Sequence, residues 1–412
     1  MEFFELTEQE YESYWKNHPL KTFLSSKEIG KLRKKRNWQV NYVGIKENET
    51  LCGATMLLSK RKKLNKYEFY SPRGFLIDYN NQKLLEYFTK EIINYIKSKN
   101  GYKLRIDPYI INKERDRDGN IIKDGKNNEK IIKNLKKLGF KKVPQNKNEQ
   151  VTWMFSLDLE GKTEEDILKE MKPNTRNIIK KTEKIGIKIK ELALDELPKF
   201  NNIIKSTGIR KHFITRDNSY YEDMYKLFHQ KNEVKYYITE LDLNNYVELL
   251  EKEKYDKENK LQRKNIKQTK KEELEKDIKI LEKKIIDAKD IKRRTNSDII
   301  TLSGSMFMLI EPEIVYLSSG NYEEYLKFNS QYLIQWELIK YGIRKGFKKH
   351  NFYGIPENIN NHPDNYGIYE FKKGFNGYVE ELIGEYELPI STYYYLDKFI
   401  HKLKEVKHAL HL

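Results

Sequence analysis

Residues 245–297 contain neither Gly nor Pro, and this segment limits the fold more than any other feature of the chain. Its second half repeats apolar residues at steps of 4, 3, 4 and 3 positions, namely Leu274, Ile278, Leu281, Ile285 and Ala288. This spacing is typical of the seam between two packed helices. With a turn near 267–271, we expect two antiparallel helices of about 24 residues, or roughly 35 Å each, and we call the segment the arm.

The sequence on both sides of the arm has the pattern of mixed α/β domains. A chain of 412 residues is long enough for two or three domains of about 100–200 residues. The order strand, strand, helix, strand occurs twice, which favours an α/β (α+β) fold of two units with the arm inserted in the second. The expected domains are 1–150 and 151–244 with 298–391, followed by a C-terminal helix over 392–412.

The chain carries 79 Lys and Arg against 62 Asp and Glu, a net charge of +17 at pH 7. This excess favours an anionic partner, which is a nucleic acid, a phosphate-bearing substrate or an anionic membrane surface. The sequence is also rich in Lys, Ile, Asn and Tyr, as an AT-biased genome produces. The charge alone therefore does not decide the function.

The composition and the motif search exclude several classes of protein. A single Cys52 excludes a disulfide framework and a Cys-cluster zinc site. There is no apolar run of about 18 residues and no signal peptide, so we expect a soluble cytoplasmic protein. The eight His residues lack metal-site spacing, and no Gly-rich nucleotide loop or Gly-x-Ser-x-Gly is present. An enzyme of this kind would act by positioning its substrates and by electrostatics, without a metal.

Two further segments stand out. Residues 113–129 are polar and rich in Asn, Asp and Gly, and they are expected to form a long loop without the carboxylate spacing of a calcium site. The segment Gly367–Pro389 interleaves Lys372 and Lys373 with aromatic residues and four glycines. It is expected to carry strands from Tyr366 to Leu388. It is either a place where a ligand approaches the backbone or an ordinary sheet edge with exposed lysines.

An ordered set of motifs gives the segment Gly367–Pro389 a family context. The pieces, in chain order, are Ser71–Gly74 with Ile77–Tyr79, Arg105–Tyr109, Met171–Gly186, Gln335–Glu337 with Ile339–Tyr341, and Asn351–Gly354. Together with Gly367–Pro389, this set resembles the Fem family of non-ribosomal peptidyltransferases (FemA, FemB and FemX, with MurM and MurN) over essentially the whole chain.

The resemblance implies two GNAT-like domains, the second interrupted by the helical arm. It implies an aminoacyltransferase that moves Gly, Ala or Ser from aminoacyl-tRNA to the stem-peptide lysine, or to a growing bridge, of a peptidoglycan precursor. The arm favours lipid II over the UDP-linked pentapeptide. Direct aminolysis of the ester needs no cofactor besides the aminoacyl-tRNA. The resemblance also implies a place at the inner face of the cell membrane and pairing with itself or with related Fem proteins.

The resemblance also assigns residues. Lys372 matches the family lysine near the reacting carbonyl, where it would stabilise the oxyanion, and Asp107 matches a proposed proton acceptor. Contacts with the phosphates and the sugar of the precursor are assigned to Arg33, Arg216, Tyr220 and Tyr316. Lys31 and Lys35 are alternatives to Arg33, and Ser318 is the alternative to Tyr316. Arg176, Lys180 and Lys181 are candidates for binding tRNA.

Two other functions compete with this interpretation. An acetyl-CoA-dependent GNAT N-acetyltransferase would hold the cofactor on an Arg/Gln-x-x-Gly-x-Gly/Ala loop, and the sequence contains no such loop. A non-enzymatic protein would use the basic coiled coil of the arm to bind RNA or another protein.

Overall fold

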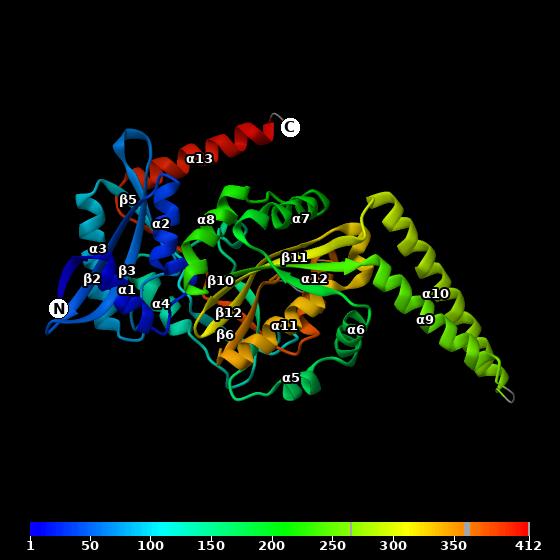
Figure 1. Ribbon diagram of the computed structural model, residues 1–412. Helices are drawn as coiled ribbons and strands as arrows, with labels where there is room; N and C mark the ends of the chain where they lie inside the picture. The colour runs from blue at the N-terminus through cyan, green and yellow to red at the C-terminus, as the bar shows by residue number, and fades with distance from the viewer. Residues whose placement is uncertain (264–265, 358–362, 411–412) are drawn as a thin grey trace. The chain divides into compact units, whose positions relative to one another are not determined.

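The computed structural model describes residues 1–263, 266–357 and 363–410 (Figure 1). It divides into two compact units. The first unit contains Met1–Leu157, Asn351–Lys373 and Gly377–Leu412. The second unit contains Asp158–His350 and Gly374–Asn376. The chain therefore returns to the first unit after it has completed the second.

The first unit is built on a seven-stranded sheet. In sheet order the strands are β1 (Glu2–Leu6), β2 (Gln39–Glu47), β3 (Thr50–Arg61), β4 (Tyr67–Ser71), β5 (Gly101–Ile106), β15 (Tyr386–Pro389) and β7 (Lys141–Lys142). The strands β4 and β5 run parallel, and the other neighbours are antiparallel. Parallel neighbours end at the same edge of a sheet, which places the residues that follow β4 and β5 side by side.

Four helices belong to this part of the first unit: α1 (Glu8–Asn17), α2 (Lys27–Lys35), α3 (Gln82–Ser98) and α4 (Glu129–Lys137). The helix α3 begins because the Asn81 side chain accepts a hydrogen bond from the backbone N–H of Leu84 (3.1 Å). It buries Leu85, Phe88 and Ile92 in the sheet core, as the apolar spacing predicts.

Three more strands of the first unit pair around β14 (Tyr378–Leu382). Its neighbours on the two sides are β6 (Ile111–Arg115) and β8 (Trp153–Asp158), both antiparallel to it. The expectation of a loop throughout 113–129 is therefore wrong at its start. The backbone of the segment folds back on itself through bridges between Lys113 and Asn127 and between Arg115 and Ile121, so its polar groups are paired.

The segment before β14 is a helix, α12 (Pro363–Lys373), where strands were expected. The strands β14 and β15 lie within the predicted range, but residues 366–373 do not extend. Pro363 occupies the first helical position, where its missing N–H costs nothing. Tyr369 and Lys372 are buried three positions apart, on one face of the helix.

The second unit has an antiparallel sheet with the order β12 (Glu313–Asn321), β11 (Ile299–Ile310), β10 (Val234–Asp242) and β9 (Lys188–Glu191). Its helices are α5 (Glu164–Glu170), α6 (Pro173–Lys184), α7 (Leu197–Lys211), α8 (Asn218–Phe228) and α11 (Ser330–Lys345). A capping box of Thr163 and Asp166 starts α5. The strand β13 (Lys349–Gly354) then leads back to the first unit.

The arm is inserted between β10 and β11. It consists of α9 (Leu243–Leu261) and α10 (Gln268–Thr295), which run antiparallel and extend away from the sheet of the second unit (Figure 1). Ion pairs fix the register, with Lys254 2.8 Å from Glu282 and Lys257 2.7 Å from Asp277. The predicted seam is buried at four positions and half-buried at the fifth: Leu274, Leu281, Ile285 and Ala288, then Ile278.

The last element is the helix α13 (Tyr393–Leu410) of the first unit. None of the helices in the described part of the chain combines the length and the apolar character needed to cross a membrane.

Candidate active site

Two of the sequence motifs meet where the parallel strands β4 and β5 end. Ser71 pairs with Ile106, so the turn Ser71–Gly74 lies beside Asp107. The backbone N–H of Arg73 donates to Oδ1 of Asp107 at 2.7 Å. Arg73 and Gly74 both have left-handed backbone conformations, and a Cβ on Gly74 would come within 2.9 Å of the Pro108 backbone. The two motifs therefore fit each other as one structural unit.

The side chains of Arg73 and Asp107 form a buried ion pair. Each is 3% exposed, and Nη1 of Arg73 lies 3.6 Å from Oδ2 of Asp107. The Arg73 guanidinium also stacks on the Tyr109 ring at 5.4 Å. Burial raises the pKa of Asp107 to about 7, against the opposing effect of Arg73, and the nearby Glu385 raises it further. Asp107 is thus a carboxyl group that titrates near neutral pH, and its role as proton acceptor stays a prediction.

A second buried carboxylate holds the neighbouring segment. Glu385, 1% exposed, accepts from the Arg105 guanidinium at 2.6–2.7 Å. Its other oxygen accepts from the backbone N–H groups of Glu149 and Gln150, both at 2.6 Å. The roles of Arg73 and Glu385 are not predictable from the sequence, because their partners are distant along the chain.

The motif Asn351–Gly354 connects this ion pair to Lys372. The Asn351 amide donates to the Tyr109 hydroxyl at 3.3 Å, and its Oδ1 accepts from the backbone N–H of Tyr353 at 2.8 Å. That second bond supports a left-handed backbone at Tyr353 (φ 63°). One residue further, the Gly354 carbonyl accepts a hydrogen bond from Nζ of Lys372 at 2.6 Å. Four motifs that are far apart in sequence are therefore joined within the first unit.

Lys372 is a buried lysine in the last turn of α12. Its side chain is 5% exposed, and burial lowers its pKa to about 7. The alternative of an exposed strand lysine is therefore wrong, because the segment is helical and this face of it is buried. An ammonium group that is buried away from water is stabilised by an anionic partner, which offsets the free-energy cost of its burial. The catalytic role of Lys372 itself stays a prediction.

The next residue, Lys373, has the opposite environment. It forms ion pairs with Asp118 and with Glu370, the latter at 3.5 Å, and these acids keep its pKa raised despite partial burial. Tyr369 donates its hydroxyl to the Arg117 carbonyl. The hydrogen bond of Tyr369 ties α12 to the turn after β6, one helical turn before Lys372.

Arg216 and Tyr220 lie together in the second unit, at the start of α8. The Arg216 guanidinium is 5.5 Å from the Tyr220 ring. The side chain of Asp217 caps the helix by accepting from the backbone N–H of Tyr220 at 2.8 Å. Arg216 is exposed, so its charge is available to a ligand.

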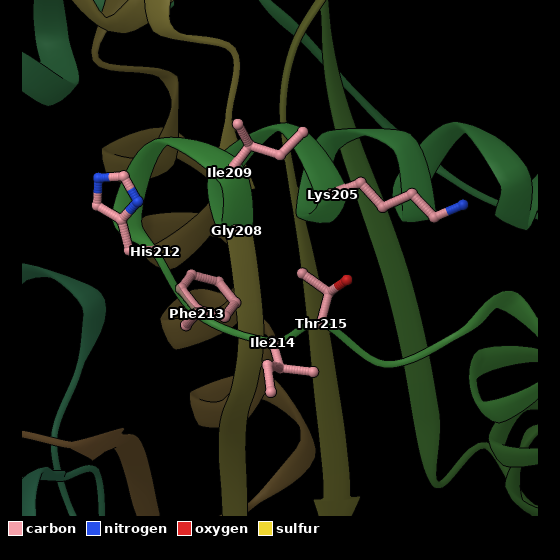
Figure 2. Close-up of a pocket in the computed structure, with 7 residues that line it drawn as sticks. All are labelled: Lys205, Gly208, Ile209, His212, Phe213, Ile214 and Thr215. Atoms are coloured by element: carbon pink, nitrogen blue, oxygen red, sulfur yellow. The ribbon is translucent and has the colours of Figure 1, made fainter. Parts of the chain in front are cut away.

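A hollow of about 420 Å³ lies directly before Arg216 in the chain (Figure 2). It is lined by Lys205, Gly208, Ile209, His212, Phe213, Ile214 and Thr215, from the end of α7 and the loop after it. His212 ends α7 in a left-handed conformation (φ 55°). The walls are mainly apolar, with one lysine. This hollow was not predicted; the one signal for it in the sequence is the apolar pair Phe213-Ile214 in a loop.

The remaining precursor-binding candidates differ in exposure. Tyr316 is buried, stacks on Phe307 at 5.3 Å, and donates to Oε1 of Gln331 at 3.1 Å. Burial raises the pKa of Tyr316 to about 12. Its alternative, Ser318, is half-buried.

Arg33, in the first unit, is half-buried and lies 6.0 Å from the Trp38 ring. Its alternative Lys31 is 3.1 Å from Glu8, and the other alternative, Lys35, is exposed. For Arg33 and Tyr316 alike, the assigned contact with the precursor stays a prediction.

Arg176 makes structural hydrogen bonds that were not predicted from the sequence. Its Nη1 donates to the carbonyls of Leu168, Lys169 and Met171 at 2.8–3.1 Å, and so caps the end of α5. Lys180 and Lys181 are exposed on α6. The role of all three in binding tRNA stays a prediction. Within the described residues, no group of three or more His, Cys, Asp and Glu side chains is placed to hold a metal ion.

Comparison with solved structures defines the class of fold. A crystal structure of FemX superposes with a TM-score of 0.71 at 23% identity, over 94% of this chain and 97% of that one. A tandem GNAT protein from the clavulanic acid biosynthesis pathway superposes with a TM-score of 0.50 at 9% identity, over 95% and 98% of the two chains. The fold is that of a protein with two GNAT-like domains, the second interrupted by the arm, so the predicted fold class is confirmed.

Comparison of sequences then gives the family. Residues 6–402 match the model of the FemAB family, and the chain belongs to that family. Aminoacyltransferase FemB of Staphylococcus epidermidis is 30% identical over 98% of this chain and all of its own length. Aminoacyltransferase FemA of the same species is 31% identical over the same shares, and that of Staphylococcus aureus 29% over 95% and 96%. The prediction of an aminoacyltransferase is confirmed, and the non-enzymatic alternative is set aside.

Arg73→Met tests the buried ion pair. Removing the guanidinium leaves the Asp107 carboxylate buried without its partner, which costs about 3–5 kcal/mol of unfolding free energy at pH 8. Because the raised pKa of Asp107 makes the folded protein hold a proton that the unfolded chain releases, the loss should be smaller at pH 5.5. Urea unfolding at both pH values measures this difference.

Arg216→Met is the matched control for this variant. The side chain is exposed, so the free energy of unfolding should change by less than about 0.5 kcal/mol at either pH. Equal stabilities of the two variants would show that the pair of Arg73 and Asp107 does not hold the first unit together.

Proposed function

We propose that this enzyme transfers Gly, Ala or Ser from aminoacyl-tRNA to the amine of a peptidoglycan precursor. The acceptor is the stem-peptide lysine or the end of a growing bridge. Membership of the FemAB family and the likeness to FemA and FemB support this proposal. The reaction uses no cofactor apart from aminoacyl-tRNA as donor.

The buried Lys372 is the observation that carries the proposal. An aminoacyl ester is already activated, so a neutral amine can attack its carbonyl once the two are held close together. The attack forms the C–N bond and a tetrahedral oxyanion, which then expels the ribose oxygen of the tRNA. A well-placed cation in a dry site stabilises such an oxyanion by about 3–4 kcal/mol. Lys372, desolvated and hydrogen-bonded to Gly354, fits this role.

Proton transfer completes the reaction. The attacking amine loses a proton and the departing ribose oxygen gains one. Asp107 belongs to the same connected group of residues as Lys372, and its pKa of about 7 suits a group that accepts and returns a proton near neutral pH.

Two features favour lipid II over the UDP-linked precursor. The chain has the arm, and the hollow at the end of α7 has apolar walls and is adjacent in sequence to Arg216. In this proposal Arg216, Tyr220, Tyr316 and Arg33 contact the phosphates and sugar, since guanidinium groups pair well with phosphate. The enzyme would work at the inner face of the cell membrane, alone or paired with a related Fem protein.

The test of this function uses the two acceptors separately. The protein is incubated with lipid II or with the UDP-linked pentapeptide, together with tRNAs charged with Gly, Ala or Ser. The masses of the products are then measured by mass spectrometry. We expect lipid II to gain the mass of one aminoacyl residue. Transfer of acetyl from acetyl-CoA without any transfer from tRNA would make the enzyme an N-acetyltransferase.

Lys372→Met should lower kcat by about 100–1,000-fold with little change in KM for the precursor, because only the transition state carries the oxyanion. In the unmodified enzyme, kcat/KM should fall above an apparent pKa near 7 as the ammonium loses its proton. Lys372→Arg, which stays charged, should not show that fall. The measurements are initial rates from pH 5.5 to 9.

Lys373→Met is the matched control for this series. It removes a neighbouring lysine that is already paired with acids, so kcat should change less than about threefold. A rise in KM alone for Lys372→Met would instead make Lys372 a clamp for precursor phosphate.

The arm should bind the tRNA backbone. Lys276, Lys279 and Lys283 are exposed along one face of α10. Their triple replacement by Ala should raise the Kd for tRNA about tenfold or more and reduce its salt dependence, because fewer counterions are released. Filter binding at several salt concentrations measures both effects.

The matched control removes Lys83, Lys90 and Lys97, which are exposed on one face of α3. It changes the net charge by the same amount, far from the arm in sequence. Equal losses in both triple variants would show that overall charge, and not the arm, attracts the tRNA.

A further inference from the structure

The helix α13 exposes an apolar face. The side chains on this face are exposed by 38–60%: Tyr395 56%, Leu396 48%, Phe399 60%, Ile400 38% and Leu403 49%. At about 100° per residue they fall within about 140° of the helix circumference. We call these five side chains the apolar face of α13.

The opposite side of α13 packs on the first unit, and it does so largely through polar contacts. Tyr394, 1% exposed, donates its hydroxyl to Glu387 at 3.1 Å. Nζ of Lys398 lies 3.1 Å from the same carboxylate, and Asp397 accepts from the Tyr102 hydroxyl at 3.0 Å. A surface helix normally turns its apolar stripe to the core and its charges to water. The arrangement of α13 is the reverse.

The first turns of α13 are therefore held firmly in this reversed orientation. Rotating the helix to bury Phe399 would break the contacts of Asp397 and Lys398 and withdraw the Tyr394 ring. The exposed apolar face is thus a fixed property of the folded first unit, and a contiguous patch of this kind marks a binding surface.

We infer that the apolar face of α13 docks on the surface of an anionic lipid bilayer. Interfacial helices combine an apolar face that contains aromatic residues with basic residues on the polar face. Tyr395 and Phe399 supply the aromatic residues. At about 100° per residue, Lys398 and Lys402 lie beside one edge of the apolar face and supply the basic residues, and Asp397 lies beyond its opposite edge.

The charge beside the helix agrees with this occupant. Lys141, exposed on β7, donates to the Tyr395 hydroxyl at 3.3 Å, which places another cation at the edge of the apolar face. The whole chain carries a net charge of +17. An anionic bilayer would attract these groups while it receives the apolar side chains.

A second copy of the chain fits this face less well. At about 200 Å² for a whole side chain, five side chains exposed by 38–60% leave less than about 600 Å². A stable protein interface uses about 800 Å² on each partner. Two copies would also bring like charges together.

This inference deepens the proposed function. It rests on the proposed function only in the statement that docking brings the enzyme to a lipid-linked acceptor. Its test is vesicle flotation, which needs neither substrate. The full chain is mixed with vesicles of equal parts phosphatidylglycerol and phosphatidylcholine, or of phosphatidylcholine alone. We expect binding to the anionic vesicles that weakens at high salt, and binding at least about tenfold weaker for Phe399→Ser with Leu403→Ser.

The matched control is Leu64→Ser with Ile286→Ser, two exposed apolar residues outside α13, and it should bind as the unmodified chain does. Equal vesicle binding by both double variants would overturn the inference. So would a dimer, seen by light scattering, that only the α13 variant loses while its vesicle binding is unchanged.

Activity assays separate the two proposals. The α13 variant should keep its rate with the soluble UDP-linked precursor or with lipid II in detergent, and lose at least about fivefold with lipid II in vesicles. An equal rate in vesicles and in detergent would show that α13 does not deliver the enzyme to the bilayer. If no aminoacyl transfer occurs with any acceptor, the proposed function fails while the vesicle result stands by itself.

Discussion

The buried ion pair of Arg73 and Asp107 is the interaction on which the candidate site depends. It lies where two parallel strands end at one edge of the first sheet, and it joins the turn after β4 to the turn after β5. Through Tyr109, Asn351 and Gly354 the same connection reaches Lys372. A connected group of contacts of this kind can hold a lysine in a position shielded from water.

Adjacent lysines on α12 show how environment, more than residue type, sets chemistry. Lys372 is buried against a carbonyl and has a pKa lowered to about 7, whereas Lys373 is paired with acids and has a raised pKa. Successive residues on a helix point about 100° apart, so a single step along the chain carries a side chain from the interior to the ion-paired surface. Without the family resemblance, nothing in the sequence distinguishes the two lysines.

The sequence predicted elements whose signals are local. The seam of the arm lies where it was expected, because it depends on neighbours three or four positions away. The helix α12 was misread because its aromatic residues also suit a strand. Arg73 and Glu385 were missed since their meaning comes from residues far along the chain, and the reversed orientation of α13 is visible only once its packing side is known.

The position of the arm has a consequence for how such proteins diverge. Its two ends are held together by the hairpin of β10 and β11, with the backbone N–H of Leu243 donating to Asp298 at 2.8 Å. For the pairing of β10 with β11, the arm therefore acts as a single connecting turn, whatever its length. Whole heptads can be gained or lost at the far end without a change of strand pairing. The surface that the arm presents can therefore change in the course of evolution while the sheet of the second unit stays as it is.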